Sequence, residues 1–388
     1  MEIVVSCEYG IEYITIDELS ELGYDAQQLV PTRILISDAD VSDIYHLSIA
    51  ARTIHRVFVL IGDFECRSMD DIIQAGRSVD FSDWMHVDQT FGIRGIREGT
   101  QDFGSMDIAR EIGSVVVDHF TDRTGKRISV NLDDPDVEIV AHHSGQRFLL
   151  LIPTSTMSLH KRIDRPYQHF AGLKSSIAAA MLRMSEWKNR QSLLDPMAGS
   201  GIIPIEAALQ AGNIVPGLLA DPSIYKFSRL AFLSPKEFQN VLEVYRGNTL
   251  PENKYRIISA DKYAKSVTGM RQNFSGFGLE NDIRAVQGKA DHLSYIEPGE
   301  MPCIVTNPPY GMRIGNPQVV KALYSNFARA CAEKQVEEVV AITPRRHHWI
   351  VSFTSNGYKL DHLQRFYFGR LNVYLMRLKA DKNQYSSI

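Results

Sequence analysis

From Leu173 onward, short apolar runs alternate with segments long enough to form helices. This alternation is typical of a largely parallel sheet that helices cover on both faces. The last two apolar runs are spaced like an antiparallel hairpin. We therefore predict an α/β domain over 171–388, with strands at 192–194, 257–260, 283–287, 303–306 and 339–342 and a hairpin at 360–367 and 373–378.

The first part of the chain shows a different pattern, in which helices and strands form two small α+β groups. The first group covers 1–62, and the second covers 63–155 and contains a predicted helix with Ser105 as its N-cap. Residues 156–170 are polar and positively charged without a periodic core pattern, so we interpret them as a linker. A chain of 388 residues is long enough for this division, because one hydrophobic core seldom organises more than about 300 residues.

The composition limits the partners and the compartment. The net charge of -4 argues against a protein coated in positive potential, so any nucleic-acid surface must be local. The four cysteines show no paired spacing, which predicts neither disulfides nor a zinc site and favours a reducing cytoplasm. No run of about 18 apolar residues occurs and the amino terminus lacks a signal-like pattern, so we expect neither membrane insertion nor secretion.

A glycine-containing turn follows the first predicted strand of the α/β domain. The sequence there is DPMAGSG, beginning at Asp195, and a helical pattern follows it. A strand, a tight turn and a helix N-terminus form the usual ligand crevice of an open α/β sheet, and Gly199 and Gly201 permit close backbone approach. The turn differs from the GxGxxG fingerprint and lacks GK[ST], which disfavours nicotinamide and nucleoside triphosphate ligands.

Acidic residues follow the next two predicted strands. Asp261 ends one strand and Asp291 comes shortly after the other. Because parallel strands end at the same edge of a sheet, Asp261 could accept from both hydroxyls of a ribose and Asp291 from an adenine amino group. Either acid alone is more often a helix cap or a surface residue, but their order beside the turn predicts an adenosyl ligand.

The fourth predicted strand runs into Asn307-Pro308-Pro309-Tyr310, the most specific signal in the chain. Two prolines cannot continue a central strand, so the chain must leave the sheet beside the crevice. An amino group conjugated to a base is a poor nucleophile because its lone pair is delocalised. The side chain of Asn307 and the carbonyl of Pro308 can each accept one amino hydrogen, and Tyr310 can stack on the base. The alternative is a simple strand-terminating turn.

These motifs resemble a known family. DPMAGSGIIPIEAAL, Asp261 and TNPPYG, in this order, resemble the amino-methylating class I methyltransferases, which include adenine-N6 DNA enzymes and protein glutamine enzymes. In the amino-terminal half, FGIRGIREG at 91–99, the helix through 107–113 and the segment 130–136 resemble a THUMP domain preceded by a ferredoxin-like unit. The whole chain is thereby similar to the THUMP-containing guanine-N2 RNA methyltransferases.

This resemblance implies S-adenosylmethionine as cofactor and methylation of guanosine N2 in tRNA. We also expect a monomer. Relatives often have Cys and Thr where this chain has Ala198 and Ile202, so any hydroxyl from position 202 is missing and Ser200 could replace it. The segment 165–174 is similar to one that lines the cofactor pocket. The implied catalytic residues are Asn307, Pro308, Pro309 and Tyr310, and the implied cofactor-binding residues are His169, Ala171, Asp195, Ala198, Gly199, Ser200, Gly201, Asp261, Lys262, Ala290, Asp291 and Asn307.

THUMP domains of this family recognise the acceptor-stem end of tRNA, which implies phosphate contacts from basic side chains. Each such side chain is, taken singly, more often a solvated surface charge. The histidines lack an accompanying ligand set, so no metal site is predicted. The candidate RNA-binding residues are Arg94, Arg97, Lys126, Lys161, Arg162, Arg165, Arg345 and Arg346.

Three alternatives remain open at this point. The first is guanine-N2 methylation of 23S rRNA; such enzymes often carry a second catalytic domain, which this chain lacks before it ends at Ile388. The second is a non-catalytic RNA-binding or assembly protein that retains a methylase fold. A DNA adenine methylase is disfavoured because the amino-terminal half has no role in one, although the Asn307 turn would serve adenine N6 almost as well.

Overall fold

The structure of the chain is a computed structural model. Two compact units make up the chain, and each includes a segment from elsewhere in the sequence. No helix within the described residues is long and apolar enough to cross a membrane. The structure describes residues 1–161, 165–167, 172–250, 254–297, 299–311, 317–369 and 371–381. The first unit is Met1–Cys7, Ile16–Arg162 and Gly217–Tyr245, and the second is Glu8–Thr15, Ile163–Pro216 and Arg246–Ile388.

An eight-stranded sheet forms the centre of the first unit. Its longest strand, β4 (Ile54–Glu65), pairs with β1 (Ile3–Cys7) on one side and with β8 (Arg147–Pro153) on the other. The two α+β groups predicted from the sequence therefore share one sheet, and their expected boundary after residue 62 falls inside β4. The remaining strands are β2 (Ala26–Val30), β3 (Arg33–Ile36), β5 (Thr90–Glu98), β6 (Ser129–Val130) and β7 (Val137–Ser144), in the order β2-β3-β1-β4-β8-β7-β5-β6.

Helix starts in this unit are set by short polar side chains. Asp40 and Ser68 form capping boxes at the starts of α2 and α3. The predicted N-cap Ser105 is wrong by one residue: Gly104 occupies that position, because its N–H donates to the Asp107 carboxylate at 2.8 Å. The helices are α1 (Glu12–Glu21), α2 (Val41–Ala50), α3 (Met69–Arg77) and α4 (Ser105–Thr124).

The segment Gly217–Tyr245 was expected in the α/β domain but belongs to the first unit. It contains most of α8 (Pro235–Gly247). The Lys226 N–H donates to the Thr154 carbonyl at 2.9 Å, and the Arg229 guanidinium binds both oxygens of Asp134 at 2.6 and 3.0 Å. Aromatic side chains complete the attachment, with rings 4.9 to 6.2 Å apart, and they are Tyr45, Tyr225, Phe227 and Phe238.

The second unit is built on a seven-stranded sheet that confirms the predicted parallel strands and hairpin. All residues of its central strands β12 and β13 are buried, as expected where helices cover both faces. Strand order reverses between β9 and β12, which is where open α/β sheets bind ligands. The order is β11 (Ile283–Gln287), β10 (Arg256–Asp261), β9 (Ser192–Asp195), β12 (Cys303–Thr306), β13 (Glu338–Thr343), β15 (Leu371–Ala380) and β14 (Tyr358–Phe368).

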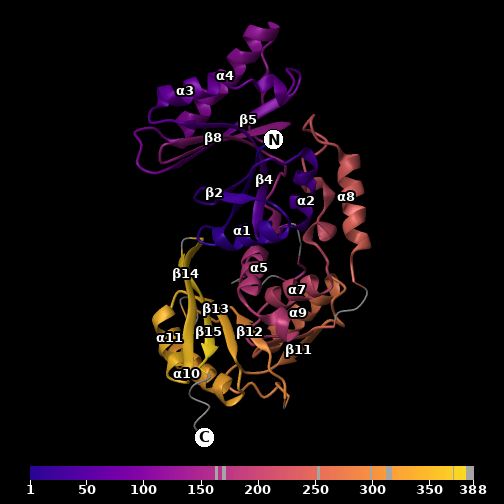
Figure 1. Cartoon of the computed structure of the whole chain (residues 1–388), viewed down its shortest axis with the longest axis vertical. Helices are drawn as coiled ribbons and strands as arrows, with labels where there is room; N and C mark the ends of the chain where they lie inside the picture. Colours follow the sequence, from indigo (N-terminus) through magenta and orange to yellow (C-terminus); the bar gives the residue numbers. More distant parts are fainter. Residues whose placement is uncertain are drawn as a thin grey trace. The chain divides into compact units, whose positions relative to one another are not determined.

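Helices of the second unit pack around this sheet (Figure 1). On one face, Phe327, Trp349 and Phe353 are fully buried in a core with residues of β12, β13 and β15. They belong to the last two helices of the chain, which cover that face. The helices are α5 (Ser175–Met184), α6 (Trp187–Arg190), α7 (Ile202–Ala211), α9 (Ala264–Gly276), α10 (Pro317–Glu333) and α11 (Arg346–Thr354).

The segment Glu8–Thr15 belongs to the second unit, although it lies near the amino terminus. The Tyr13 hydroxyl lies 2.8 Å from Nε2 of His362 on β14. Gly10 has a φ of +91°, and a Cβ there would lie 2.6 Å from the Arg365 carbonyl oxygen. Only glycine fits this close approach without displacing β14.

We predict that Glu18 is a strong determinant of the stability of the first unit. Its buried carboxylate accepts from the backbone N–H groups of Arg52 and Thr53, both at 2.8 Å, and from the Thr53 hydroxyl. Glu18→Ala leaves these donors without an acceptor, which should lower the free energy of unfolding by about 3 kcal/mol. Urea denaturation checks this result. The exposed control Asp17→Ala should change the free energy of unfolding by less than about 0.5 kcal/mol. An equal loss of stability in both variants would contradict the role of Glu18.

Candidate functional site

The ends of β9 and β12 are joined by a buried hydrogen bond. The Thr306 hydroxyl donates to the Asp195 carboxylate at 2.7 Å, and the Met197 N–H donates to the same oxygen at 3.2 Å. Asp195 is 1% exposed and Thr306 is fully buried. The glycine turn and the Asn307 turn are therefore held at one edge of the sheet. Sequence reasoning did not identify Thr306, for which the only signal is its place directly before Asn307.

The environment of Asp195 changes its ionisation. Burial raises its pKa to about 7, with a smaller contribution from the charge of Asp261, while the bonds from Thr306 and Met197 oppose the shift. The carboxyl group is thus directed into the protein and holds a proton more readily than an ordinary aspartate. Its predicted role in cofactor binding stays a prediction.

The glycine turn is fastened to the end of β10. The Gly199 N–H donates to one Asp261 oxygen at 3.1 Å, and the Tyr263 N–H donates to the other at 2.9 Å. Gly201 has a φ of +79°, and a Cβ there would lie 2.6 Å from the Phe274 ring. These contacts fix the turn in a left-handed backbone conformation that suits glycine. Each Asp261 oxygen keeps a further lone pair for a ligand donor.

Acceptors gather where β10 and β11 end. The Gly288 N–H donates to the Asp261 carbonyl at 3.0 Å, which brings the Asp291 segment beside Asp261. The Tyr295 hydroxyl is buried with no hydrogen-bond partner among the described residues. Burial first, and then the charges of Asp195, Asp261 and Asp291, raise the pKa of Tyr295. A ligand that carries hydroxyl and amino donors, such as an adenosyl group, fits this set of carboxylates and its unpaired hydroxyl.

The Asn307 turn is held from two sides. The Tyr324 hydroxyl donates to the Pro309 carbonyl at 2.9 Å and lies 3.0 Å from the Thr343 hydroxyl. On the other side, Nε of Arg345 donates to the Tyr310 carbonyl at 2.5 Å. Tyr324 and Thr343 are fully buried. Neither has a sequence signal, because their contact with the turn depends on the packing of α10 against β13.

Two acceptors of the turn differ in their hydrogen bonding. The Tyr310 hydroxyl donates to the Asn307 side-chain oxygen at 2.7 Å. The Pro308 carbonyl takes part in no hydrogen bond among the residues that the structure describes. Burial raises the pKa of Tyr310, so its hydroxyl remains a donor over the physiological pH range. The turn can therefore offer one free carbonyl and one amide oxygen with a spare lone pair.

Other residues predicted around the ligand lie nearby in different settings. Ser200 is buried, and its carbonyl accepts from the Asn273 side chain at 2.9 Å. The Lys262 ammonium lies over the Tyr263 ring, 4.7 Å from its centroid. Ala198 and Ala290 are buried. Three predicted residues lie outside the described residues, and they are Arg162, His169 and Ala171.

The predicted RNA-binding residues are divided between the two units. Arg94 and Arg97 are exposed, but their odd spacing on β5 directs them to opposite faces. Lys126 lies 3.8 Å from Asp88. Lys161 is exposed and Arg165 is half-buried. Of the last pair, Arg345 binds the Asn307 turn, and the Arg346 guanidinium lies 4.7 Å from the Tyr374 ring centroid.

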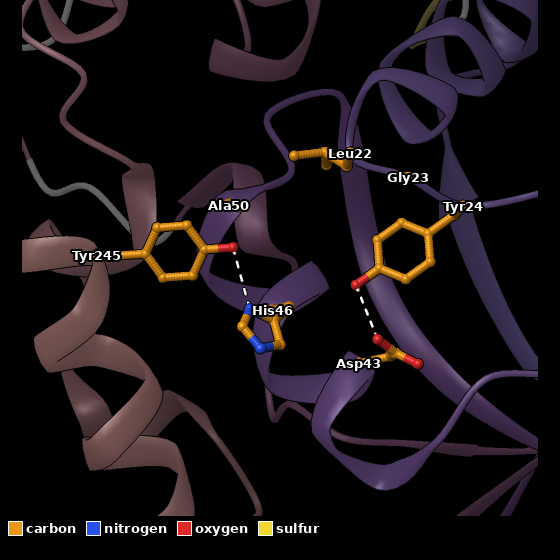
Figure 2. A pocket seen from close by; sticks show the side chains of 7 residues that line it. All are labelled: Leu22, Gly23, Tyr24, Asp43, His46, Ala50 and Tyr245. Atoms are coloured by element: carbon orange, nitrogen blue, oxygen red, sulfur yellow. Dashed lines mark hydrogen bonds between the residues drawn. The ribbon is translucent and has the colours of Figure 1, made fainter. Parts of the chain in front are cut away.

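A pocket in the first unit lies among side chains that sequence reasoning did not select (Figure 2). Its polar groups bond to one another: the Tyr24 hydroxyl donates to Asp43 at 3.1 Å, and His46 Nδ1 lies 3.1 Å from the Tyr245 hydroxyl. Because these groups satisfy each other, the sheet edge is the better candidate site. No group of three potential metal ligands converges anywhere in the described part of the chain.

Comparison with known proteins gives consistent matches along the chain. Residues 162–371 match the family described as RMKL-like, methyltransferase domain, 66–152 match the THUMP domain, and 2–58 match the RlmL ferredoxin-like domain. The chain is 33% identical to a tRNA (guanine(6)-N2)-methyltransferase of Archaeoglobus fulgidus, over 95% of this chain and 89% of the relative. It is 32% identical to a protein of the same name from Methanocaldococcus jannaschii, over 86% and 87% of the two chains.

Solved structures share the fold. The crystal structure of SMU.472, complexed with SAH, superposes with a TM-score of 0.85 at 22% identity and covers 98% of both chains. At this level of identity the comparison shows a common fold. It confirms the fold class that the sequence predicts.

We predict that Asp195→Asn stabilises the chain relative to the natural protein. This gain in stability should be larger at neutral pH than at acidic pH. The asparagine oxygen can still accept from Thr306 and Met197, but the side chain cannot ionise. The natural chain loses stability as the pH rises from the ordinary carboxyl pKa of 3.8 to about 7, because its unfolded state releases the proton first.

The stability advantage of Asp195→Asn should therefore grow between pH 5 and 7 and then level off at roughly 2 to 4 kcal/mol. Urea denaturation of both proteins at several pH values measures it. An advantage that does not change with pH would contradict a raised pKa.

Proposed function

The chain belongs to the RMKL-like methyltransferase family, and from this membership we propose that it transfers a methyl group from S-adenosylmethionine to the exocyclic N2 of a guanosine in tRNA. Two relatives named tRNA (guanine(6)-N2)-methyltransferase support the substrate, and the THUMP match supports an RNA partner. The observation that carries the proposal is the Asn307 turn beside the glycine turn, with the Thr306 to Asp195 hydrogen bond between them.

The Asn307 turn provides the means to activate an amino group. The Asn307 side-chain oxygen and the Pro308 carbonyl each accept one amino hydrogen, which draws the nitrogen lone pair out of conjugation. Both acceptors also stabilise the positive charge that develops on this nitrogen during transfer. The nitrogen loses its proton after transfer, so no strong general base is needed.

Tyr310 takes part in base recognition. Its hydroxyl already bonds to Asn307, and the amide oxygen has a second lone pair for the substrate amino group. The ring stacks on the guanine once the base has left its helix, as enzymes that act on base atoms require. Pro308 and Pro309 keep the turn rigid, so that positioning supplies most of the rate.

The cofactor supplies an electrophilic methyl group on a positively charged sulfur. We infer that Asp261 accepts from the ribose hydroxyls and Asp291 from the adenine amino group. Gly199 and Gly201 leave room for the close approach of the ligand to the backbone. The further proposed cofactor-binding residues are His169, Ala171, Asp195, Ala198, Ser200, Lys262, Ala290 and Asn307.

Methyl transfer from labelled S-adenosylmethionine to total tRNA and, separately, to ribosomal RNA tests this function. Nucleoside analysis of the product should give labelled N2-methylguanosine from tRNA. Label in ribosomal RNA would indicate that this RNA is the substrate in place of tRNA. Label in N6-methyladenosine would indicate that adenine N6 is the methylated atom in place of guanine N2. Absence of label together with retained cofactor binding would favour a non-catalytic RNA-binding protein.

We predict that Asn307→Ala lowers kcat by at least roughly 100-fold, because one of two preorganised acceptors is lost. The dissociation constant of S-adenosylmethionine, measured by calorimetry, should rise by no more than about threefold, since Asn307 is one of several proposed cofactor contacts and the carboxylates that are proposed to bind the adenosyl part are unchanged. Asn326→Ala, which alters a half-buried asparagine on α10, serves as the matched control. Near-natural activity of Asn307→Ala would overturn the mechanism.

We predict that Tyr324→Phe lowers kcat by removing a hydrogen bond that holds the same turn. The phenylalanine ring preserves the core, but the bond to the Pro309 carbonyl is lost. Loss of one hydrogen bond corresponds to about a tenfold fall in kcat, with little change in KM for RNA. The matched control is Tyr358→Phe, which removes a buried hydroxyl bonded to the Val336 carbonyl. If Tyr324→Phe and Tyr358→Phe lower kcat equally, Tyr324 contributes to stability alone.

A further inference from the structure

The hairpin β14–β15 brings a row of residues level with the catalytic turn. Thr306 of β12 is in register with Ala341 of β13, and Thr343 lies two residues further along the same strand. Thr343 pairs with Tyr374 of β15, and Tyr374 pairs with Arg365 of β14. The end of the hairpin that holds Arg365 therefore lies at the edge of the sheet where Asn307 follows β12.

Cationic and aromatic side chains alternate along this row. The Arg346 guanidinium lies over Tyr374, and directly paired residues on neighbouring strands project from one face. Arg365 lies on that face and contacts Tyr367, two residues along β14, 5.6 Å from its ring centroid. The Tyr367 ring contacts Tyr9 at 5.4 Å. The aromatic–arginine row consists of Arg346, Tyr374, Arg365, Tyr367 and Tyr9.

The row is accessible to solvent. Tyr9 is 46% exposed and Tyr367 is 38% exposed, and Arg346 and Arg365 are also exposed. Large exposed aromatic rings beside arginines present π faces and positive charge together. This combination is the one that binding surfaces for single-stranded nucleic acid use.

The charges of the row are not neutralised. Arg365 donates to the Asn372 side chain at 2.9 Å and to the Tyr367 hydroxyl at 3.2 Å, both neutral acceptors. Neither Arg346 nor Arg365 forms an ion pair within the described residues. At the opposite end of the hairpin every cation has a carboxylate partner, and the pairs are Arg377 with Asp361, Lys379 with Glu186, and Lys359 with Asp381. Among the described residues of the hairpin, a cation without a carboxylate partner thus remains only at the end that lies level with the catalytic turn.

The row is connected to the turn through the chain itself. Arg345 directly precedes Arg346 and donates to the Tyr310 carbonyl. Arg346 therefore directly follows the residue that holds the turn at Tyr310, where the target base is proposed to lie. Because the target base must leave its stack, the nucleotides beside it need new stacking and phosphate partners.

We propose that the aromatic–arginine row binds the unstacked RNA strand beside the target nucleotide. Arg346 and Arg365 contact phosphates, and Tyr367 and Tyr9 stack on neighbouring bases. This inference rests on the proposed function for its substrate class, and it assigns the RNA path to residues outside the THUMP match. It adds Arg365, Tyr367 and Tyr9 to the RNA-binding residues predicted from the sequence, while Tyr374 supports the Arg346 guanidinium.

The experiment measures RNA affinity of the full chain by fluorescence anisotropy with labelled total tRNA at several salt concentrations. The double variant of Arg346→Gln and Arg365→Gln should weaken binding about tenfold. It should also reduce the slope of log affinity against log salt by about 1.4, because two phosphate contacts to a single strand are lost. Lys359→Gln, which removes an ion-paired cation from the opposite end of β14, is the matched control and should leave both values unchanged.

A second double variant, Tyr9→Leu with Tyr367→Leu, separates stacking from charge. It should weaken RNA binding several-fold without changing the salt slope, since leucine keeps apolar bulk but offers no ring for a base. Natural affinity and salt slope in both double variants would overturn the row as an RNA surface. Because binding is measured directly, this result can be told apart from failure of the proposed function, in which the natural chain methylates no RNA.

Discussion

The hydrogen bond from Thr306 to Asp195 is the interaction on which the site depends. It joins the two strands between which the order of the sheet reverses, so it fixes the distance between the glycine turn and the Asn307 turn. Burial makes this bond worth more than one at the surface, and it also raises the pKa of Asp195. A chemistry that relies on positioning needs such a fixed separation, because small displacements of reacting groups cost much of the rate.

Further hydrogen bonds hold the two turns that this bond brings together. Asp261 holds the glycine turn through the Gly199 N–H, while Tyr324 and Arg345 hold the two carbonyls of the Asn307 turn that follow Pro308. These two bonds satisfy carbonyls that the proposed chemistry does not use. No residue that the structure describes bonds to the Pro308 carbonyl, which the proposed chemistry uses for the substrate.

Much of the second unit could be predicted from the sequence. Its strands are short apolar runs, and the prolines after Thr306 and the glycines after Asp195 mark where the chain leaves the sheet. These signals are local. Tyr324 and Thr343 carry none, because a tyrosine on a helix and a threonine in a strand become supports for the turn only through tertiary packing. Tyr9 and Tyr367 carry no sequence signal for the same reason, because their contact joins the amino-terminal segment with β14. Predictions of individual cofactor-binding residues remain for experiment.

The segment Gly217–Tyr245 has a consequence for the order in which the chain matures on the ribosome. The first unit needs this segment to cover Tyr45 with Phe227 and Phe238, yet the residues that complete its sheet are synthesised much earlier. An emerging chain therefore carries Tyr45 and Ile49 of α2 without their cover while the glycine turn and the helix after it are translated. Exposed patches of this kind are where nascent chains meet chaperones or aggregate, so the timing of synthesis is itself part of how this protein reaches its fold.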